Sequence, residues 1–216
     1  MALKEIHQTG NQSGWAIWHI EESDKELASK IIGIPPADIT HESKKLEWLA
    51  ARHLVLSLSN HLGMRYFGVK KDGFGKPFLE KYPHQLSLSH SFPYVAVQID
   101  HDQPIGIDLE QPKAKILKIA PRIFSPVELT DAAADVIKHT VYWCAKETLY
   151  KIHGKGNVHF SSQLNVEPFS LQQEGTLQGI ISIEEKTRVN LLYRIDPDYV
   201  LVRTGRNDDK GNALSD

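Results

Sequence analysis

The stretch Gly106-Ile107-Asp108-Leu109-Glu110 (GIDLE, residues 106–110) has the apolar residues of a buried strand but carries two acidic side chains. Because alternate residues of a strand share a face, Asp108 and Glu110 are expected to point to the same side. Two carboxylates on one face repel each other, and burial increases the repulsion. A divalent cation would remove this penalty, whereas a solvated strand end would make it small. The stretch alone leaves both interpretations open, and a wet strand end is the commoner arrangement.

A third acidic residue lies in the segment YWCAKETLYK, residues 142–151, whose apolar spacing predicts a helix. In this helix Glu147 and Lys151 are one turn apart and point the same way. Lys146 is turned from Glu147 by about 100°. An ordinary surface ion pair of this spacing contributes a few tenths of a kcal/mol, so the segment by itself is a weak indication of a site.

The order of predicted helices and strands favours the α+β class. Apolar alternation predicts strands at residues 15–20, 86–100 and 104–110. Leucines at near-helical spacing predict a long helix over residues 41–63, and a helical region, broken in the middle, should run from Ser125 to about residue 153. Further strands follow after the second helical region. Strands and helices are therefore grouped rather than strictly alternating, which is typical of α+β folds.

A short internal similarity suggests that the chain contains two related halves. WLAAR (residues 48–52) and WCAKE (residues 143–147) each lie on the main predicted helix of one half. Two similar helix-plus-sheet lobes would explain the similarity. Coincidence between two amphipathic helices is the alternative, because weak similarity is common in short windows.

Composition limits the classes of function. The chain has 216 residues with 25 basic and 27 acidic side chains, a formal net charge of −2. This balance argues against a protein that binds nucleic acid by general attraction to phosphates. One cysteine, Cys144, rules out an intramolecular disulfide and fits a reducing compartment. The sequence shows no signal peptide, and no apolar stretch approaches the ~20 residues of a membrane span, so we expect a cytoplasmic protein without a membrane partner.

Taken together, the motifs resemble the signature of the 4′-phosphopantetheinyl transferases. The two decisive segments are Gly106–Glu110, as G-I-D-x-E, and Trp143–Lys151, as W-[CST]-x-K-E-x-x-x-K. FGKPFL (residues 74–79) resembles the family's G-K-P segment, LSLSHS (residues 86–91) its S-H-S segment, and WLAAR (residues 48–52) its arginine-bearing helix. Motifs spread over this length are similar to the larger, surfactin-synthetase-activating type of the family.

The resemblance implies a fold with two pseudo-symmetric lobes, each a small, mostly antiparallel sheet packed on a long helix. The N-terminal lobe would span residues 1–103 and the C-terminal lobe residues 104–216, with the active site between them. The resemblance also implies a monomer. The polar tail from about residue 207 is expected to be disordered.

The resemblance also implies a reaction. Such an enzyme transfers the 4′-phosphopantetheine group of coenzyme A to a serine hydroxyl of an apo carrier protein and releases adenosine 3′,5′-bisphosphate. Asp108, Glu110 and Glu147 would hold Mg²⁺, with Mn²⁺ as an alternative, against the pyrophosphate. Glu147, Lys151 and Asp108 are the predicted catalytic residues. The serine proton would go to Glu147 through a water relay, or to a metal-bound water held by Glu110 or Glu147.

Contacts to coenzyme A, the co-substrate, are implied for cationic and hydroxyl side chains of the motifs. Each has an ordinary alternative: a surface arginine on a helix, a lysine on a hairpin, or a satisfied histidine in a loop. Arg52 would meet the 3′-phosphate, because its guanidinium matches an anion with a fork of donors. The predicted binding residues are Arg52, Lys76, Pro77, Ser89, His90, Lys146 and Lys151.

A basic stripe follows the GIDLE stretch. Lys115, Lys118 and Arg122 would share one face of a helix, and an acidic carrier protein, acyl or peptidyl, would dock there. A solvated helix face is the alternative. Two other functions remain open: a magnesium-dependent phosphohydrolase acting on a nucleotide or diphosphate, and a non-catalytic coenzyme A-binding protein. The sequence leaves the pathway of the carrier, fatty-acid or secondary-metabolite synthesis, undefined.

Overall fold

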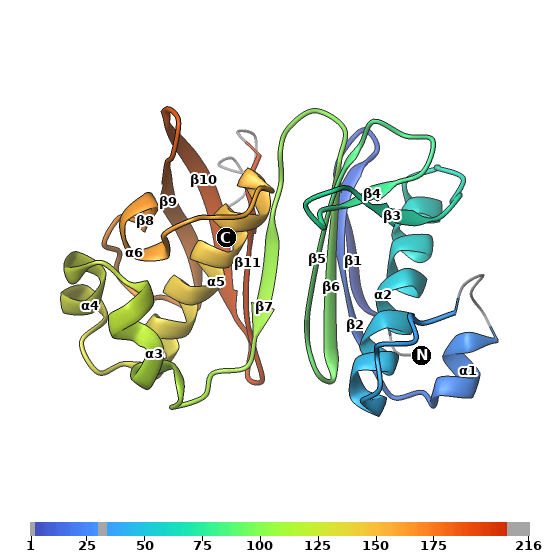
Figure 1. Cartoon of the computed structure of the whole chain (residues 1–216), viewed down its shortest axis with the longest axis horizontal. Helices are drawn as coiled ribbons and strands as arrows, with labels where there is room; N and C mark the ends of the chain where they lie inside the picture. Colours follow the sequence, from blue (N-terminus) through green and yellow to red (C-terminus); the bar gives the residue numbers. More distant parts are fainter. Residues whose placement is uncertain (1–2, 30–33, 207–216) are drawn as a thin grey trace, which may run out of the picture. The chain divides into compact units, whose positions relative to one another are not determined.

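The computed structural model of the chain contains two antiparallel sheets, and each sheet packs on one long helix (Figure 1). The structure describes residues 3–29 and 34–206. The chain divides into two compact units, Met1–Ile105 and Gly106–Asp216, called the N-terminal and C-terminal units below. The α+β class predicted from the sequence is confirmed. The predicted pseudo-symmetry of two lobes stays a prediction.

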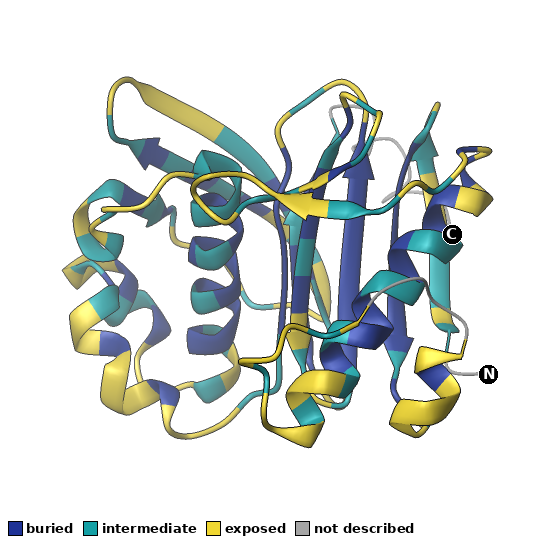
Figure 2. Ribbon diagram, turned by 45° about the vertical axis from the view of Figure 1, so that its right-hand side comes forward, coloured by how far each residue is buried: buried dark blue, intermediate teal, exposed yellow. Residues whose placement is uncertain are grey.

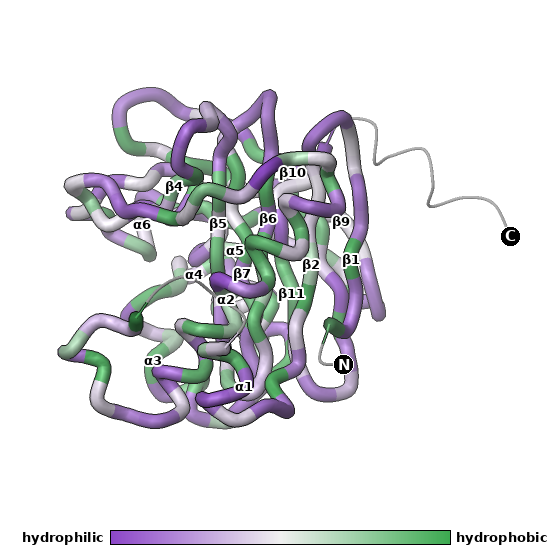
Figure 3. The backbone as a smooth tube through the Cα atoms, turned by 90° about the vertical axis from the view of Figure 1, so that its right-hand side faces the viewer, coloured by the Kyte–Doolittle hydropathy of each residue, from purple (hydrophilic) through white to green (hydrophobic). Residues whose placement is uncertain are grey.

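The N-terminal unit contains a six-stranded sheet in the order β1-β2-β6-β5-β4-β3, with every neighbouring pair antiparallel. Short connections between consecutive strands explain the antiparallel pairing. Figure 3 shows hydrophobic colouring along β2 and β6, which lie inside this sheet. The strands are β1 (Leu3–Gly10), β2 (Ser13–His19), β3 (Val69–Lys71), β4 (Pro77–Leu79), β5 (Gln85–Ser91) and β6 (Tyr94–Asp100).

Helix α2 (Glu42–His61) packs on this sheet through its leucine face. Leu49, Leu54 and Leu58 are buried in one core with residues of the strands, as their near-helical spacing predicts. Gly63, at a φ of +70°, follows the end of the helix in the left-handed region that glycine adopts readily. The short helix α1 (Asp24–Ala28), which begins at a capping box, is the other helix described in this unit.

The C-terminal unit contains a five-stranded antiparallel sheet in the order β7-β11-β10-β9-β8. Figure 2 shows buried residues, in dark blue, along the strands and along the helix faces that cover them. The strands are β7 (Ile107–Glu110), β8 (Leu164–Val166), β9 (Glu174–Ser182), β10 (Lys186–Ile195) and β11 (Val200–Thr204).

Helix α5 (Val136–His153) packs on β7, β11 and the neighbouring strands of this sheet. Asp135 caps its N-terminus by accepting hydrogen bonds from two backbone N–H groups, and Gly154 ends it at a φ of +70°. The predicted break in the helical region from Ser125 is confirmed, because Ala133, with a positive φ, separates α4 from α5. The remaining helices are α3 (Ile116–Ile123), α4 (Pro126–Ala132) and α6 (Phe160–Gln163).

One element differs from the sequence-based expectations. Strand β1 has no counterpart among the predicted strands, because its alternation of apolar and polar residues is weak. The expected tail from about residue 207 lies outside the described residues. Within residues 3–29 and 34–206, none of the helices combines the length and apolar character needed to cross a membrane.

Candidate active site

Strand β7 lies directly against helix α5 at Gly106. A Cβ atom at position 106 would overlap the carbonyl oxygen of Thr148, so only glycine allows this approach. The Gly106 N–H donates to the Thr204 hydroxyl at 2.9 Å, which fixes the start of the strand on the neighbouring strand β11. Because alternate residues share a face, Asp108 and Glu110 are on the side of β7 that Gly106 presents to α5.

Lys151 of α5 reaches the acidic face of this strand. Its Nζ donates to the Asp108 Oδ1 at 2.7 Å and to the backbone carbonyl oxygen of Ile107 at 2.8 Å. The Asp108 side chain is only 5% exposed, so this ion pair is shielded from water. The pair joins the two sequence motifs and places a cation on the buried strand carboxylate.

Glu147 lies one turn before Lys151 and is electrostatically coupled to both acids of β7. The pKa of Glu147 is raised to about 7, first because burial disfavours the charged carboxylate and then because Asp108 and Glu110 are negative. The positive charge of Lys151 acts in the opposite direction. The structure thus brings Asp108, Glu110, Glu147 and Lys151 into one local group, whereas the metal-binding role of the three acids stays a prediction.

Cys144, one turn before Thr148, is fully buried against the same group. Burial, followed by the negative charges of Asp108 and Glu110, raises the pKa of its thiol well above the usual value. The thiol is therefore protonated at neutral pH and is a poor nucleophile.

The chemistry of this acidic group suits a hard divalent cation. Carboxylate oxygens are the ligands that Mg²⁺ prefers, and a cation would offset both the burial of Glu147 and the negative charges of Asp108 and Glu110, which together raise its pKa. As the side chains lie, no group of three or more His, Cys, Asp or Glu residues within the described ranges is arranged to hold a metal ion. The positive charge beside Asp108 comes from Lys151.

Lys146, predicted to contact a phosphate, lies in the core of the C-terminal unit. Its Nζ is fully buried and donates to Glu128 Oε2 at 2.8 Å and to the carbonyl oxygens of Phe160 and Leu164 at 2.7 and 2.6 Å. These three contacts use all three hydrogens of the ammonium group. The predicted phosphate contact does not fit this geometry, because the 100° turn from Glu147 points Lys146 toward α6 and β8.

Glu128 is the buried partner that sequence reasoning missed. It accepts hydrogen bonds from the backbone N–H groups of Ser125, at 2.7 Å, and Val166, at 2.9 Å, in addition to Lys146. In the sequence, Glu128 stands three residues after Ser125, which is the spacing of a capping box. The spacing of a capping box does not indicate that Glu128 also pairs with Lys146.

In the N-terminal unit, His90 and Ser89 occupy opposite faces of strand β5: Ser89 is buried and His90 is exposed. The His90 Nδ1 lies 3.2 Å from Oε2 of Glu47, a buried residue of α2. Burial alone would raise the pKa of Glu47, but hydrogen bonds and charges from His90 and Lys44 together lower it. Sequence reasoning selected His90 but not Glu47.

Arg52 and Lys76, the two predicted cations of the same unit, are both partly withdrawn from solvent. The Arg52 guanidinium stacks on the ring of Trp48, 3.9 Å from its centroid, and no carboxylate among the described residues pairs with it. Burial lowers the pKa values of Arg52 and of Lys76. Lys76 follows a hairpin turn and precedes Pro77, the first residue of β4, and its backbone N–H donates to Asp72.

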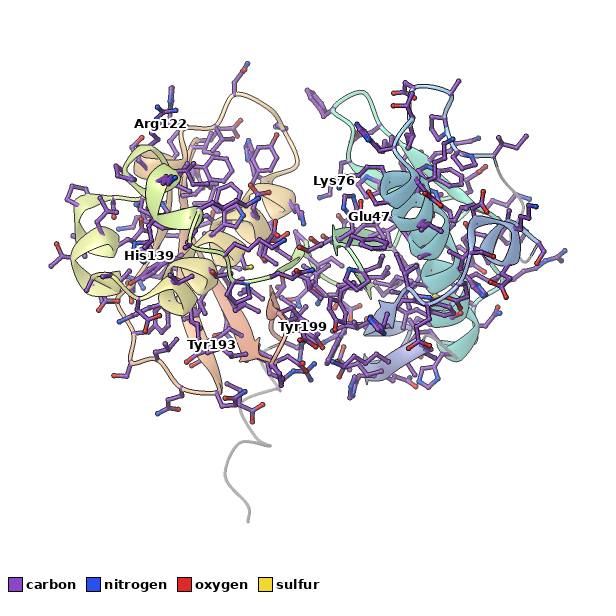
Figure 4. All side chains as sticks on the ribbon, turned by 90° about the horizontal axis from the view of Figure 1, so that it is seen from below. Glu47, Lys76, Arg122, His139, Tyr193 and Tyr199 are labelled. Atoms are coloured by element: carbon purple, nitrogen blue, oxygen red, sulfur yellow. The ribbon has the colours of Figure 1, made fainter. Side chains whose placement is uncertain are left out.

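The basic stripe lies on α3, as predicted. Lys115 is the residue before the helix, and Lys118 and Arg122 are exposed on it. Figure 4 shows the labelled Arg122 at the periphery of the C-terminal unit. Leu117 and Ile119, exposed by 36% and 41%, accompany the cations.

Comparison with known proteins agrees with these motifs. Residues 104–201 match the family model described as the 4′-phosphopantetheinyl transferase superfamily. The chain is 34% identical over 132 residues to the 4′-phosphopantetheinyl transferase Sfp of Bacillus subtilis, covering 58% of this chain and 57% of the relative. It is 30% identical over 154 residues to the 4′-phosphopantetheinyl transferase psf-1 of Bacillus pumilus, covering 68% of this chain and 64% of the relative.

These matches span between about half and two thirds of the length of the curated relatives. The family model begins just before strand β7 and includes all of α5, so it contains both segments that form the acidic group. The chain is thus similar to the 4′-phosphopantetheinyl transferase superfamily over residues 104–201, which contain the acidic group.

Proposed function

We propose that this protein transfers the 4′-phosphopantetheine group of coenzyme A to a serine hydroxyl of an apo acyl or peptidyl carrier protein, releasing adenosine 3′,5′-bisphosphate. The names of the curated relatives support this activity. The observation that carries the proposal is the local group in which Lys151 contacts Asp108 beside the coupled carboxylate of Glu147. Phosphoryl chemistry depends mainly on positioned charge, and this group supplies charges of both signs.

In this proposal Lys151 orients and neutralises the pyrophosphate of coenzyme A. Asp108 and the Ile107 carbonyl hold its ammonium in place, which reduces the entropy lost when the substrate binds. Without a bound cation the pKa of Glu147 is about 7, which suits the removal of a proton from the serine hydroxyl near neutral pH, whereas a metal ion bound to this carboxylate would lower its pKa. A water relay would carry the proton if Glu147 also binds a metal.

Asp108, Glu110 and Glu147 are the residues that would hold magnesium, or manganese in its place. When bound, the ion supplies positive charge for the pyrophosphate and for the leaving oxygen.

The nucleotide end of coenzyme A would use cations of the N-terminal unit. Arg52, held against Trp48, would bind the 3′-phosphate, since a guanidinium without a carboxylate partner keeps its donors for an anion. Lys76 and Pro77 would contact the adenosine side, and Ser89 and His90 a phosphate. Partial burial of Arg52 and Lys76 supports this, because desolvated cations gain from an anionic ligand.

A carrier protein would dock on the exposed surface of α3. Lys115, Lys118 and Arg122 offer positive charge to an acidic partner, and Leu117 and Ile119 offer apolar area at the centre of the contact. We expect the protein to act as a monomer.

The test is mass spectrometry of several apo carrier proteins after incubation with coenzyme A and Mg²⁺. Each substrate should gain the mass of one phosphopantetheine group, and the gain should vanish with EDTA or when the acceptor serine is replaced by alanine. Cleavage of coenzyme A at the same rate without any carrier protein would instead identify a phosphohydrolase and contradict the proposal.

A further inference from the structure

Glu47 is a buried carboxylate that links helix α2 to the turn between β5 and β6. Its side chain is only 3% exposed, and Figure 4 labels it on α2. Its Oε1 accepts a hydrogen bond from the backbone N–H of Phe92 at 3.1 Å, and its Oε2 lies 2.7 Å from the Lys44 Nζ and 3.2 Å from the His90 Nδ1. A buried carboxylate is costly unless paired, and these three contacts pair it.

The contact with Glu47 fixes which side of the imidazole ring carries a hydrogen. An ionised carboxylate can only accept, so the His90 nitrogen that faces it, Nδ1, must be the donor. The other nitrogen, Nε2, is then directed away from Glu47. His90 keeps a side-chain exposure of 46%, so the ring is held at one nitrogen and remains accessible to a ligand.

We propose that Glu47 is a positioning residue that holds His90 by its Nδ1–H and thereby presents Nε2 to an anionic phosphate of coenzyme A. This inference rests on the proposed function, in which His90 contacts such a phosphate. Glu47 does not touch the substrate itself. It acts through the orientation of the imidazole, whose Nε2 can donate to a phosphate when both ring nitrogens carry a hydrogen.

The geometry gives the contact a direction of pH dependence. With hydrogens on both nitrogens, His90 donates to Glu47 and to the phosphate at the same time; the neutral ring held by Glu47 has no hydrogen on Nε2. The charged group in contact with His90 is the Glu47 carboxylate of α2, which also contacts the Lys44 ammonium of the same helix. The residue opposite His90 on β6 is the uncharged Val95. Coenzyme A binding should therefore weaken as the ring loses its second proton.

Glu47→Gln is the informative variant. Glutamine keeps the size of the side chain and an oxygen for the Phe92 N–H, but it turns an amide N–H₂ toward Nδ1 of His90. The neutral ring should then carry its hydrogen on Nε2 and donate without a charge. Glu42→Gln, at an exposed position in the first turn of the same helix, is the matched control.

The experiment combines two measurements on the full chain. Nitrogen-15 NMR of the His90 ring should show the Nδ1–H tautomer in the wild type at high pH and the Nε2–H tautomer in Glu47→Gln. The KM for coenzyme A should rise with pH in the wild type. In Glu47→Gln the KM should be about tenfold higher at low pH, with a flatter pH profile and a kcat within about twofold, whereas Glu42→Gln should match the wild type.

The two proposals fail in different ways. An Nε2–H tautomer in the wild type, or an unchanged KM profile in Glu47→Gln, overturns the positioning role even if transfer is efficient. If the wild type transfers nothing from coenzyme A, the proposed function fails, and the role of Glu47 toward a phosphate fails with it, even where the NMR tautomer shows that Glu47 holds the ring. The wild-type spectrum does not depend on the folding of any variant.

Discussion

The Nζ of Lys146 lies 2.8 Å from Oε2 of Glu128, and neither side chain is exposed by more than 1%. The two residues connect the first turn of α4 to the middle of α5, and through the carbonyls of Phe160 and Leu164 they also hold α6 and the start of β8. Lys146 immediately precedes Glu147. The position of Glu147 is thus supported from inside the unit by an ion pair that takes no part in the chemistry.

Removing one partner of this pair should strongly destabilise the protein. We expect Lys146→Met to lower the free energy of unfolding by about 3–5 kcal/mol, because the Glu128 carboxylate is left buried and unpaired. Urea unfolding followed by circular dichroism measures the change. Arg188→Met, which removes an exposed pair with Glu167, is the control and should cost less than about 1 kcal/mol. Equal losses for the two variants would contradict the buried role of Lys146.

Replacing Lys151 should strongly reduce transfer. Lys151→Met removes the ammonium beside Asp108, and we expect kcat/KM to fall by about 100-fold, the usual cost of losing one electrostatic contact to the transition state. Mass-spectrometric initial rates on one apo carrier protein provide the measurement. Lys155→Met is the control, because this lysine is 57% exposed and its Nζ lies 3.8 Å from the exposed Glu184, a weak ion pair. The transfer rate of this variant should stay within about twofold of the wild type.

Charge reversal on α3 should weaken carrier binding without affecting coenzyme A. We expect Lys115→Glu combined with Lys118→Glu to raise the carrier-protein KM and to remove most of its dependence on salt, because the attraction is between charges. The matched control is Lys186→Glu with Arg188→Glu, two exposed cations of β10. An unchanged carrier KM in the α3 variant would eliminate this surface as the docking site.

Acid should destabilise the N-terminal unit through His84. This ring is 4% exposed and neither nitrogen has a hydrogen-bond partner. Burial, followed by the charge of His101, lowers its pKa, with Asp100 and Asp102 acting in the opposite direction. The unfolded chain therefore binds this proton more readily, and stability should fall as pH drops below about 6.5, the ordinary value for histidine.

The measurement is the free energy of unfolding in urea at several pH values between neutral and mildly acidic. His84→Gln should have a flatter profile over this range than the wild type, because the titrating ring is gone. His153→Gln, which replaces a half-buried histidine at the end of α5, is the control. A wild-type profile that stays level below the ordinary histidine value would count against this account of His84.

Sequence periodicity predicted the parts of the site that depend on local geometry. The alternation of β7 placed Asp108 and Glu110 on one face, and the helical spacing of α5 placed Glu147 and Lys151 on one side. The partner of Lys151 was not predictable from spacing. Its nearest acid in the helix is Glu147, yet its ammonium contacts Asp108, 43 positions away. Only the packing of the strand on the helix decides between them.

Burial of single charged residues was the other property that spacing did not reveal. Lys146 and Glu47 are both buried, although lysine and glutamate usually lie exposed, so composition favours a solvated position for both. Their partners, Glu128 and His90, lie on different elements. Strand β1 was missed because its pairing with β2, rather than its own pattern, makes it a strand.

The glycine at position 106 also limits which substitutions this protein can accept. Because Gly106 lies against the Thr148 carbonyl, an added methyl group would push the strand away from the helix and shift Asp108 and Glu110 relative to Glu147 and Lys151. A substitution at this position therefore changes the distances between the charged groups of the strand and those of the helix, although glycine itself has no reactive side chain.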